Sequence, residues 1–184
     1  MSLYVALLRG INVSGQKKIL MADLRVLFAE AGFAQVQTYI QSGNVIFGSP
    51  KTSNVVEIKL LIEQAIERNY SYHVAVTILA PEEIKNILHG NPFVQQNLDI
   101  TKLGVTLLSD LPSQEQIMLL DTYDFTPDEF IYQDKLVYVY YPNGFGRSKL
   151  TNNFFESKLK RSATSRNWKT MLKLHELSSQ VRES

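Results

Sequence analysis

Apolar and polar positions along the chain predict strands and helices in a definite order. An apolar run at residues 3–8 has the length of a buried strand, and a polar loop follows at residues 9–18. Apolar residues then recur at helical spacing, and Gly32 is placed to end the helix. The apolar residues of this helix are Leu20, Leu24, Leu27, Phe28 and Ala31.

The stretch after this helix predicts a β-hairpin. Residues 36–40 and 45–47 are strand-like, and they flank a Gln-Ser-Gly-Asn segment. Gly43 and Asn44 tolerate the positive φ of a tight turn. We therefore expect two neighbouring antiparallel strands here.

A helix and a further strand complete the first half of the chain. Asn54 and Glu57 resemble a capping box that opens a helix, and residues 74–79 are strand-like. The resulting order, βαββαβ, is that of the split βαβ or ferredoxin-like unit. In this unit the end of the first strand and the turn between the second and third lie at one edge of the sheet. Residues 9–18 and 41–44 are therefore expected to converge.

The second half repeats this order with different residues. Pro81 and Gly90 bound a short connecting helix, and residues 91–100 are interpreted as a loop. The pattern then predicts strands at residues 103–107, 129–132 and 136–141, and helices that open near Ser113 and Asn152. A long C-terminal helix has one apolar stripe, made by Trp168, Met171, Leu174, Leu177 and Val181.

These patterns predict an α+β protein with two ferredoxin-like halves, antiparallel sheets and a C-terminal helix. The first half spans residues 1–80. Residues 81–100 form a connecting helix and loop. The second half spans residues 101–184 and includes the C-terminal helix.

Composition narrows the class of protein further. The 184 residues are 45% hydrophobic, which is enough for a core, and no apolar run approaches the roughly 20 residues of a membrane helix. We therefore expect a cytoplasmic protein with no membrane partner. The absence of cysteine excludes disulfides and thiolate ligands, and the three histidines are far apart, so no metal site is predicted.

Charge is distributed unevenly, although the net charge is only +1. Residues 81–144 have three Lys or Arg against ten Asp or Glu, a balance of −7, whereas residues 145–184 have nine against three, a balance of +6. A nearly neutral chain is not expected to bind DNA strongly and non-specifically. The basic stretch at residues 147–173 is either a local positive patch or a solvated helix face.

The loop at residues 9–18 is the first candidate site, because glycines, polar side chains and cations lie together between a strand and a helix. Backbone amides and cations in such a loop can hold an anion. The ordinary alternative is a connecting loop whose polar groups are structural. With the converging turn, the predicted anion-binding residues are Arg9, Asn12, Gly15, Lys17, Ser42, Gly43 and Asn44.

The second half contains two further cationic stretches. Residues 142–151 form a loop with Gly144, Gly146 and Lys149, which is either an anion-binding nest or a flexible connection. In the stretch at residues 164–170, an N-cap at Thr164 or Ser165 would place cations in the first helical turn. Cations are unfavourable there unless an anion is near. The predicted contacts from this half are Lys149, Arg166 and Asn167.

One anion site across the two halves would explain both sets of residues, with Arg9 and Arg166 in a single cleft. The alternative is that Arg166 pairs with a carboxylate of the acidic middle segment. The carboxylates of that segment are interpreted as a solvated surface, because they lie in a turn-rich stretch without a partnered base. They include Asp121, Asp124, Asp128 and Glu129.

Several stretches together resemble one bacterial family, known as domain of unknown function 1697. The resemblance covers the whole chain. Its motifs are LLRGINVSGQKKILMADL, TYIQSGNVIF, NPF at residues 91–93, SKL at residues 148–150 and ATSRNWKTMLKL. Members usually have a glycine where this chain has Ser14 and a threonine where it has Ser165. The resemblance implies two ferredoxin-like halves and no established activity, cofactor or catalytic residue.

The sequence therefore predicts a protein that binds a phosphate-bearing anion, either a nucleotide or a nucleic-acid end, between its two halves. The alternatives are a metal-independent enzyme that acts on that phosphate and a non-catalytic protein-interaction module. The pattern identifies no catalytic residue, no cofactor and no oligomeric state.

Overall fold

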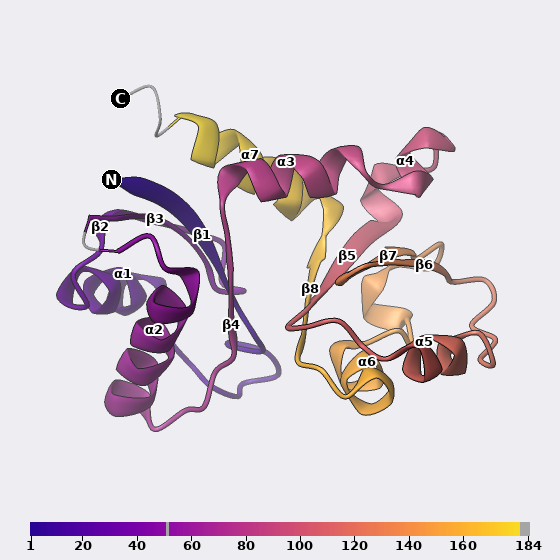
Figure 1. Cartoon of the computed structure of the whole chain (residues 1–184), viewed down its shortest axis with the longest axis horizontal. Coiled ribbons are helices and arrows are strands. Elements are labelled where there is room, and N and C mark those ends of the chain that lie inside the picture. Colours follow the sequence, from indigo (N-terminus) through magenta and orange to yellow (C-terminus); the bar gives the residue numbers. More distant parts are fainter. Residues whose placement is uncertain (51, 181–184) are drawn as a thin grey trace. The chain divides into compact units, whose positions relative to one another are not determined.

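The computed structural model describes residues 1–50 and 52–180, which form two compact units. The first unit is Met1–Asn86 together with the chain from Lys173 onward, and the second is Ile87–Leu172. The chain therefore changes unit inside helix α3, Pro81–His89, and again inside helix α7, Trp168–Gln180. Each unit has a four-stranded antiparallel sheet with helices on one face (Figure 1). The prediction of two ferredoxin-like halves is confirmed.

The sheet of the first unit has the strand order β2-β3-β1-β4. Its strands are β1 (Ser2–Leu8), β2 (Ala34–Tyr39), β3 (Asn44–Ser49) and β4 (Val76–Leu79), and its covering helices are α1 (Met21–Glu30) and α2 (Val55–Tyr70). Strand β1 pairs antiparallel with both β3 and β4, and its residues from Tyr4 to Leu8 are all buried. The predicted order of elements, βαββαβ, is confirmed.

The core of the first unit lies between its sheet and the two helices. Helix α1 contributes Leu24, Leu27 and Phe28, and the Phe28 ring meets that of Phe47 edge to face, with 5.3 Å between the ring centroids. Helix α2 begins as predicted after Asn54, whose side chain accepts hydrogen bonds from two backbone amides of the first turn. Leu20, however, is the exposed N-cap of α1 and not part of its buried face.

The second unit repeats the same strand order, as β6-β7-β5-β8. Its strands are β5 (Leu103–Leu108), β6 (Glu129–Gln133), β7 (Leu136–Tyr140) and β8 (Ala163–Asn167). Its helices are α4 (Pro92–Gln95), α5 (Gln114–Leu120) and α6 (Asn152–Leu159), with short 3-10 turns η1 (Ile100–Lys102) and η2 (Phe145–Arg147). The predicted capping box of α5 is present, because Ser113 and Gln116 each bind the other's backbone amide.

Strand β8 corrects the prediction for residues 163–167, which we interpret from sequence as the approach to and start of a helix. The segment pairs antiparallel with β5 instead. It has no apolar alternation, because three of its four buried residues are polar or charged, namely Thr164, Ser165 and Arg166. The Ser165 hydroxyl lies 2.6 Å from the buried Thr106 hydroxyl and donates to Asn152 Oδ1 at 2.6 Å. These contacts between distant parts of the sequence make a polar segment into a strand.

A second correction concerns residues 91–100, where the sequence predicts only a loop. The buried Asn91 side chain accepts from the Phe93 amide at 2.9 Å and so caps helix α4, with Pro92 at the first helical position. Asn followed by Pro is a favoured start of a helix, so the sequence did contain a local signal for this short helix.

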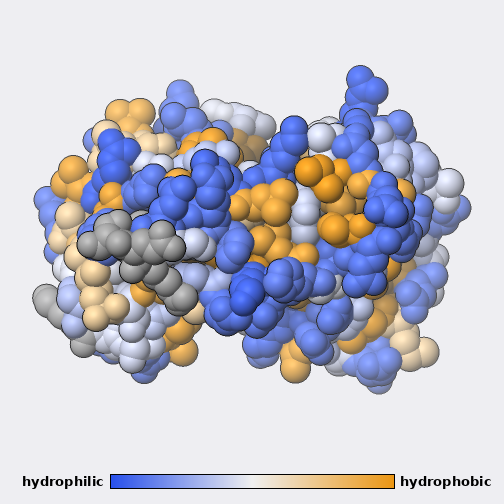
Figure 2. Space-filling model, turned by 90° about the horizontal axis from the view of Figure 1, so that it is seen from above, coloured by the Kyte–Doolittle hydropathy of each residue, from blue (hydrophilic) through white to orange (hydrophobic). Residues whose placement is uncertain are grey.

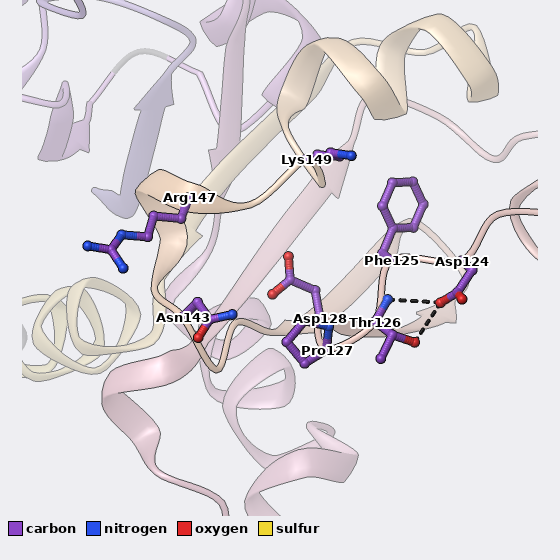
Figure 3. Close-up of a pocket in the computed structure, with 8 residues that line it drawn as sticks. All are labelled: Asp124, Phe125, Thr126, Pro127, Asp128, Asn143, Arg147 and Lys149. Atoms are coloured by element: carbon purple, nitrogen blue, oxygen red, sulfur yellow. Dashed lines mark hydrogen bonds between the residues drawn. The ribbon is translucent and has the colours of Figure 1, made fainter.

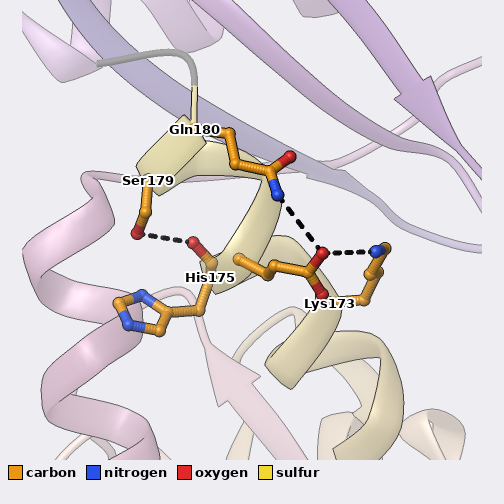
Figure 4. A network of polar contacts seen from close by, with 5 residues as sticks. Lys173, His175, Ser179 and Gln180 are labelled. Atoms are coloured by element: carbon orange, nitrogen blue, oxygen red, sulfur yellow. Dashed lines mark hydrogen bonds and ion pairs between the residues drawn. The ribbon is translucent and has the colours of Figure 1, made fainter. Parts of the chain in front are cut away.

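Helix α7 has polar contacts between residues about one turn apart (Figure 4). Lys173 Nζ donates to Glu176 Oε1 at 2.6 Å, and Gln180 Nε2 donates to the same oxygen at 3.4 Å. The hydroxyls of Ser178 and Ser179 donate to the His175 carbonyl. The predicted stripe residue Val181 lies outside the described residues.

In the described part of the chain, no helix combines the length and the apolar character needed to cross a bilayer.

We predict that Tyr138→Phe destabilises the protein. The buried Tyr138 hydroxyl donates to the Ile87 carbonyl at 3.0 Å, and burial raises the pKa of Tyr138 to about 12. Its removal leaves a buried carbonyl unpaired, which costs about 1–3 kcal/mol. Urea unfolding measures the change, with Tyr132→Phe as the control on the same sheet. A change as small as that of the control would contradict this role for the hydroxyl.

Candidate functional site

The loop between β1 and α1 has an unusual backbone. Five of its residues have positive φ, namely Gly10, Asn12, Ser14, Gly15 and Lys17. Val13 and Gln16 pair as a β-bridge, and the Gln16 amide donates to the Val13 carbonyl at 2.9 Å. Ser14 and Gly15 are therefore the two central residues of a tight hairpin, and positive φ at both is typical of a type I′ turn.

The side chain of Asn12 connects this loop to the turn after β2. Its Nδ2 donates to the carbonyls of Ile19 and Gln41, both at 2.9 Å, and its Oδ1 accepts from the Ile19 amide at 2.9 Å. The predicted convergence of residues 9–18 with residues 41–44 is therefore confirmed. Both amide hydrogens of Asn12 are used in these contacts, so the side chain has a structural role.

The turn at residues 41–44 is also held by its own polar groups. The fully buried Asn44 donates to the Tyr39 carbonyl and to the Ser42 hydroxyl, both at 3.0 Å. Gly43 has φ +78°, and a Cβ there would lie 2.7 Å from Ile11 Cδ1. Its carbonyl accepts from the Leu8 amide at 2.8 Å. A side chain at position 43 would separate the two segments.

Two predicted residues of the first loop also bind backbone carbonyls, Lys17 through its side chain and Arg9 through its backbone amide. Lys17 Nζ donates to the His73 carbonyl at 2.6 Å, and the Arg9 amide donates to the Ala75 carbonyl at 2.9 Å. The structure thus joins Asn12 to the turn, whereas the Lys17 side chain and the Arg9 backbone contact the segment that leads into β4, and Gly15 lies in the hairpin turn of the loop. Their contact with an anion stays a prediction.

The remaining predicted residues, Lys149, Arg166 and Asn167, belong to the second unit. Arg166 lies in β8, where burial lowers the pKa of its guanidinium to about 10, and it donates to the Ser165 carbonyl at 2.9 Å. Asn167 Oδ1 accepts from the Thr170 amide at 2.8 Å, as an N-cap of α7 does. The predicted N-cap at Thr164 or Ser165 is therefore wrong.

This correction removes one premise of the shared site. Arg166 precedes the helix, so it is not a cation in the first helical turn, and Lys169 is the basic residue there. Arg9 belongs to the first unit and Arg166 to the second. A single anion bound by both stays a prediction.

The second unit contains a hollow of about 400 Å³ that the sequence does not indicate. Two loops form it, one before β6 and one after β7 (Figure 3). Its lining is mostly polar and consists of Asp124, Phe125, Thr126, Pro127, Asp128, Asn143, Arg147 and Lys149. We call this hollow the β6–β7 pocket.

The loop before β6 is fixed by a local turn and by aromatic packing. Asp124 Oδ1 accepts from both the hydroxyl and the amide of Thr126, at 2.6 and 2.9 Å, and these bonds lower the pKa of Asp124. Thr126 precedes Pro127 through a cis peptide bond. The Phe125 ring packs edge-on against Phe154 of α6, with 4.8 Å between centroids. This wall of the pocket is therefore anchored in the core.

The loop after β7 supplies the cations of the pocket. Gly144 has φ +90°, and its amide donates to the Tyr141 carbonyl at 2.9 Å. The turn η2 follows, with the Arg147 amide bonded to the Gly144 carbonyl at 3.1 Å. The exposed side chains of Arg147 and Lys149 make no hydrogen bond or ion pair within the described residues. Both cations are therefore available to a ligand.

Asp128 is the acidic group at the centre of the pocket. Figure 3 shows its carboxylate directed toward the loop that holds Arg147 and Lys149, whereas the Arg147 guanidinium extends away from it. The Asp128 amide donates to the Phe125 carbonyl at 2.9 Å, which fixes its backbone. Sequence reasoning missed this residue, because a carboxylate in a turn-rich stretch has no local signal that separates a pocket from open solvent.

The described residues contain no cluster of three or more acidic or histidine side chains that could hold a metal ion. Figure 2 shows apolar residues in patches bordered by hydrophilic ones on the face that it draws. Exposed apolar side chains include Leu20, Val56 and Met118. Such residues are normal on protein surfaces, so they do not favour the interaction-module alternative.

Comparison with known proteins places the chain in a family. The family model described as "Protein of unknown function (DUF1697)" matches residues 1–138, so the chain belongs to this family. No curated protein matches the chain. A solved structure described as conserved bacterial protein SP0830 from Streptococcus pneumoniae is similar, with a TM-score of 0.77 and 21% identity over 97% of this chain and 99% of that one. This likeness shows a shared fold.

We predict that Asn12→Ala destabilises the first unit by about 2–3 kcal/mol, because three hydrogen bonds are lost and alanine is strained at φ +56°. Urea unfolding measures the change. Asn12→Gly accepts the same backbone conformation, so it separates the hydrogen bonds from the strain. Gln16→Ala, on the exposed part of the same loop, is the control. A loss below about 0.5 kcal/mol for Asn12→Ala would contradict the structural role.

Proposed function

We propose that the protein binds a phosphate-bearing molecule, a nucleotide or a nucleic-acid end, in the β6–β7 pocket. The observation that carries the proposal is the pair of cations, Arg147 and Lys149, on a glycine-containing loop beside a hollow of about 400 Å³. Neither side chain has a hydrogen bond or ion pair within the described part of the chain. Cations on such a loop are suited to phosphate oxygens.

The charges of the pocket support an anion of this kind. Asp124 Oδ1 already accepts two hydrogen bonds from Thr126. Asp128 is then the acidic group that remains to face the ligand. The pocket lining also contains two cations, Arg147 and Lys149, so positive charge is in excess. The first loop is less suitable, because Asn12, Asn44 and Lys17 already bind backbone carbonyls. Among the eight lining residues there is no histidine, so the pocket offers binding groups and no histidine general base.

We expect the double variant Arg147→Ala/Lys149→Ala to bind inorganic phosphate and adenosine monophosphate at least about tenfold more weakly than the wild type. Two charge-assisted hydrogen bonds of about 1.5–3 kcal/mol each are lost. Isothermal titration calorimetry measures the affinities. The matched control is Lys135→Ala/Lys169→Ala, which removes the same charge from exposed positions of the second unit. Equal losses in both double variants would indicate a general charge effect and overturn the proposal.

Salt dependence tests how a nucleic-acid end is held. Two cations neutralise about two phosphates, and each contributes a slope of about −0.7 when the logarithm of affinity for a single strand is plotted against that of salt concentration. We expect a slope near −1.4 for a 5′-phosphorylated oligonucleotide, measured by fluorescence anisotropy. The same oligonucleotide without its 5′-phosphate is the control and should bind more weakly. A slope that corresponds to roughly 6 to 10 phosphates would show an extended nucleic-acid surface instead.

A further inference from the structure

The β6–β7 pocket has an aromatic ring in its lining. Phe125 is the aromatic residue among the eight that line the hollow, and its side chain is half-buried. Neighbouring rings hold it in place. The Phe154 ring meets it edge to face at 4.8 Å between centroids, and the Tyr123 ring lies nearly parallel to it at 6.0 Å. A ring that is fixed in this way and still reaches the hollow offers a ligand an apolar surface at little cost in side-chain entropy.

Phe125 and Asp128 are the first and last residues of one tight turn. The Asp128 amide donates to the Phe125 carbonyl at 2.9 Å, which closes a four-residue turn and keeps the two Cα atoms within about 7 Å of each other. Both side chains line the hollow, and in Figure 3 they leave the turn in the same direction. A group that lies against the Phe125 ring is therefore beside the Asp128 carboxylate.

The Asp128 carboxylate is an acceptor that the protein leaves open to a ligand. It is half-buried, and it makes no hydrogen bond or ion pair within residues 1–50 and 52–180. An ionised carboxylate can only accept hydrogen bonds, so it favours a neighbour with N–H groups and disfavours a phosphate oxygen. Arg147 and Lys149, which suit the phosphate, come from the other loop of the hollow. The wall made by Phe125 and Asp128 is therefore suited to a part of the ligand other than its phosphate.

Guanine is the nucleobase that matches both groups of this wall. Every base can stack on an aromatic ring. Guanine also presents two adjacent donors, N1–H and its amino group, which match the two oxygens of a carboxylate, whereas adenine and cytosine have a ring-nitrogen acceptor beside their amino group. Resting on the proposed function, we infer that the β6–β7 pocket takes a guanine nucleotide, whose base stacks on Phe125 and donates to Asp128 and whose phosphate binds Arg147 and Lys149.

The test compares guanosine monophosphate, adenosine monophosphate and ribose 5-phosphate by isothermal titration calorimetry. Wild-type protein binds guanosine monophosphate about tenfold more tightly than adenosine monophosphate, because adenine brings an acceptor against the Asp128 carboxylate. It binds guanosine monophosphate about a hundredfold more tightly than ribose 5-phosphate, because stacking of the base adds about another tenfold to the same phosphate contacts.

Two variants separate the contacts of the base. In Phe125→Leu both nucleotides bind about tenfold more weakly and the affinity for ribose 5-phosphate is unchanged, because leucine keeps an apolar side chain but offers no ring. Phe145→Leu is the matched control, since it changes an exposed ring that does not line the hollow, and it keeps the wild-type affinities. In Asp128→Asn the preference for guanine over adenine falls to about threefold or less, and ribose 5-phosphate binds more tightly because a negative charge is removed.

Equal wild-type affinities for the two nucleotides overturn the inference while leaving the phosphate site in place. A loss of nucleotide affinity in Phe145→Leu that is absent in Phe125→Leu does the same. Absence of binding for all three ligands overturns the proposed function as well. The comparison of the three ligands uses the unaltered protein, so the inference is tested even if Phe125→Leu does not fold, which thermal unfolding checks.

Discussion

The structure depends on two central strands whose backbones must be paired on both sides. In β1 the residues from Tyr4 to Leu8 are buried, and in β5 every residue is buried. Buried amides and carbonyls need partners, so each strand has a neighbour on either edge. This requirement produces the same strand order in both units. The loops emerge at the ends of these strands, and both candidate sites are found there.

Local signals in the sequence predicted most elements, because strands, helices and caps have short-range patterns. The caps at Asn54 and Ser113 follow from residues within one helical turn. Strand β8 does not follow from such a pattern. Its residues become a strand only because β5, about 60 positions earlier in the chain, offers a free edge and the buried hydroxyl of Thr106. A local pattern in either segment cannot indicate that two segments so distant in the sequence will pair.

The sequence likewise predicts where some polar residues lie, but it does not predict which contacts their side chains make. The convergence of the first loop with the turn at residues 41–44 followed from topology, and the structure confirms it. Sequence could not show that the Asn12 side chain would be used by three backbone groups. Nor could it show that Asp124 accepts hydrogen bonds from Thr126 while Asp128 lines the β6–β7 pocket. A residue type states which bonds a side chain can make, and the packed chain decides which of them remain available.

Burial also divides the arginines of the second unit into different kinds. Arg166 is enclosed and its pKa is lowered to about 10, so it remains charged at neutral pH and needs its charge balanced by fixed contacts. Arg147 is exposed on a short turn, where binding an anion requires little desolvation of protein. Asp128 opposes a bare anion in the same pocket. The β6–β7 pocket therefore combines two exposed cations with one half-buried carboxylate, so a group that enters it meets charges of both signs.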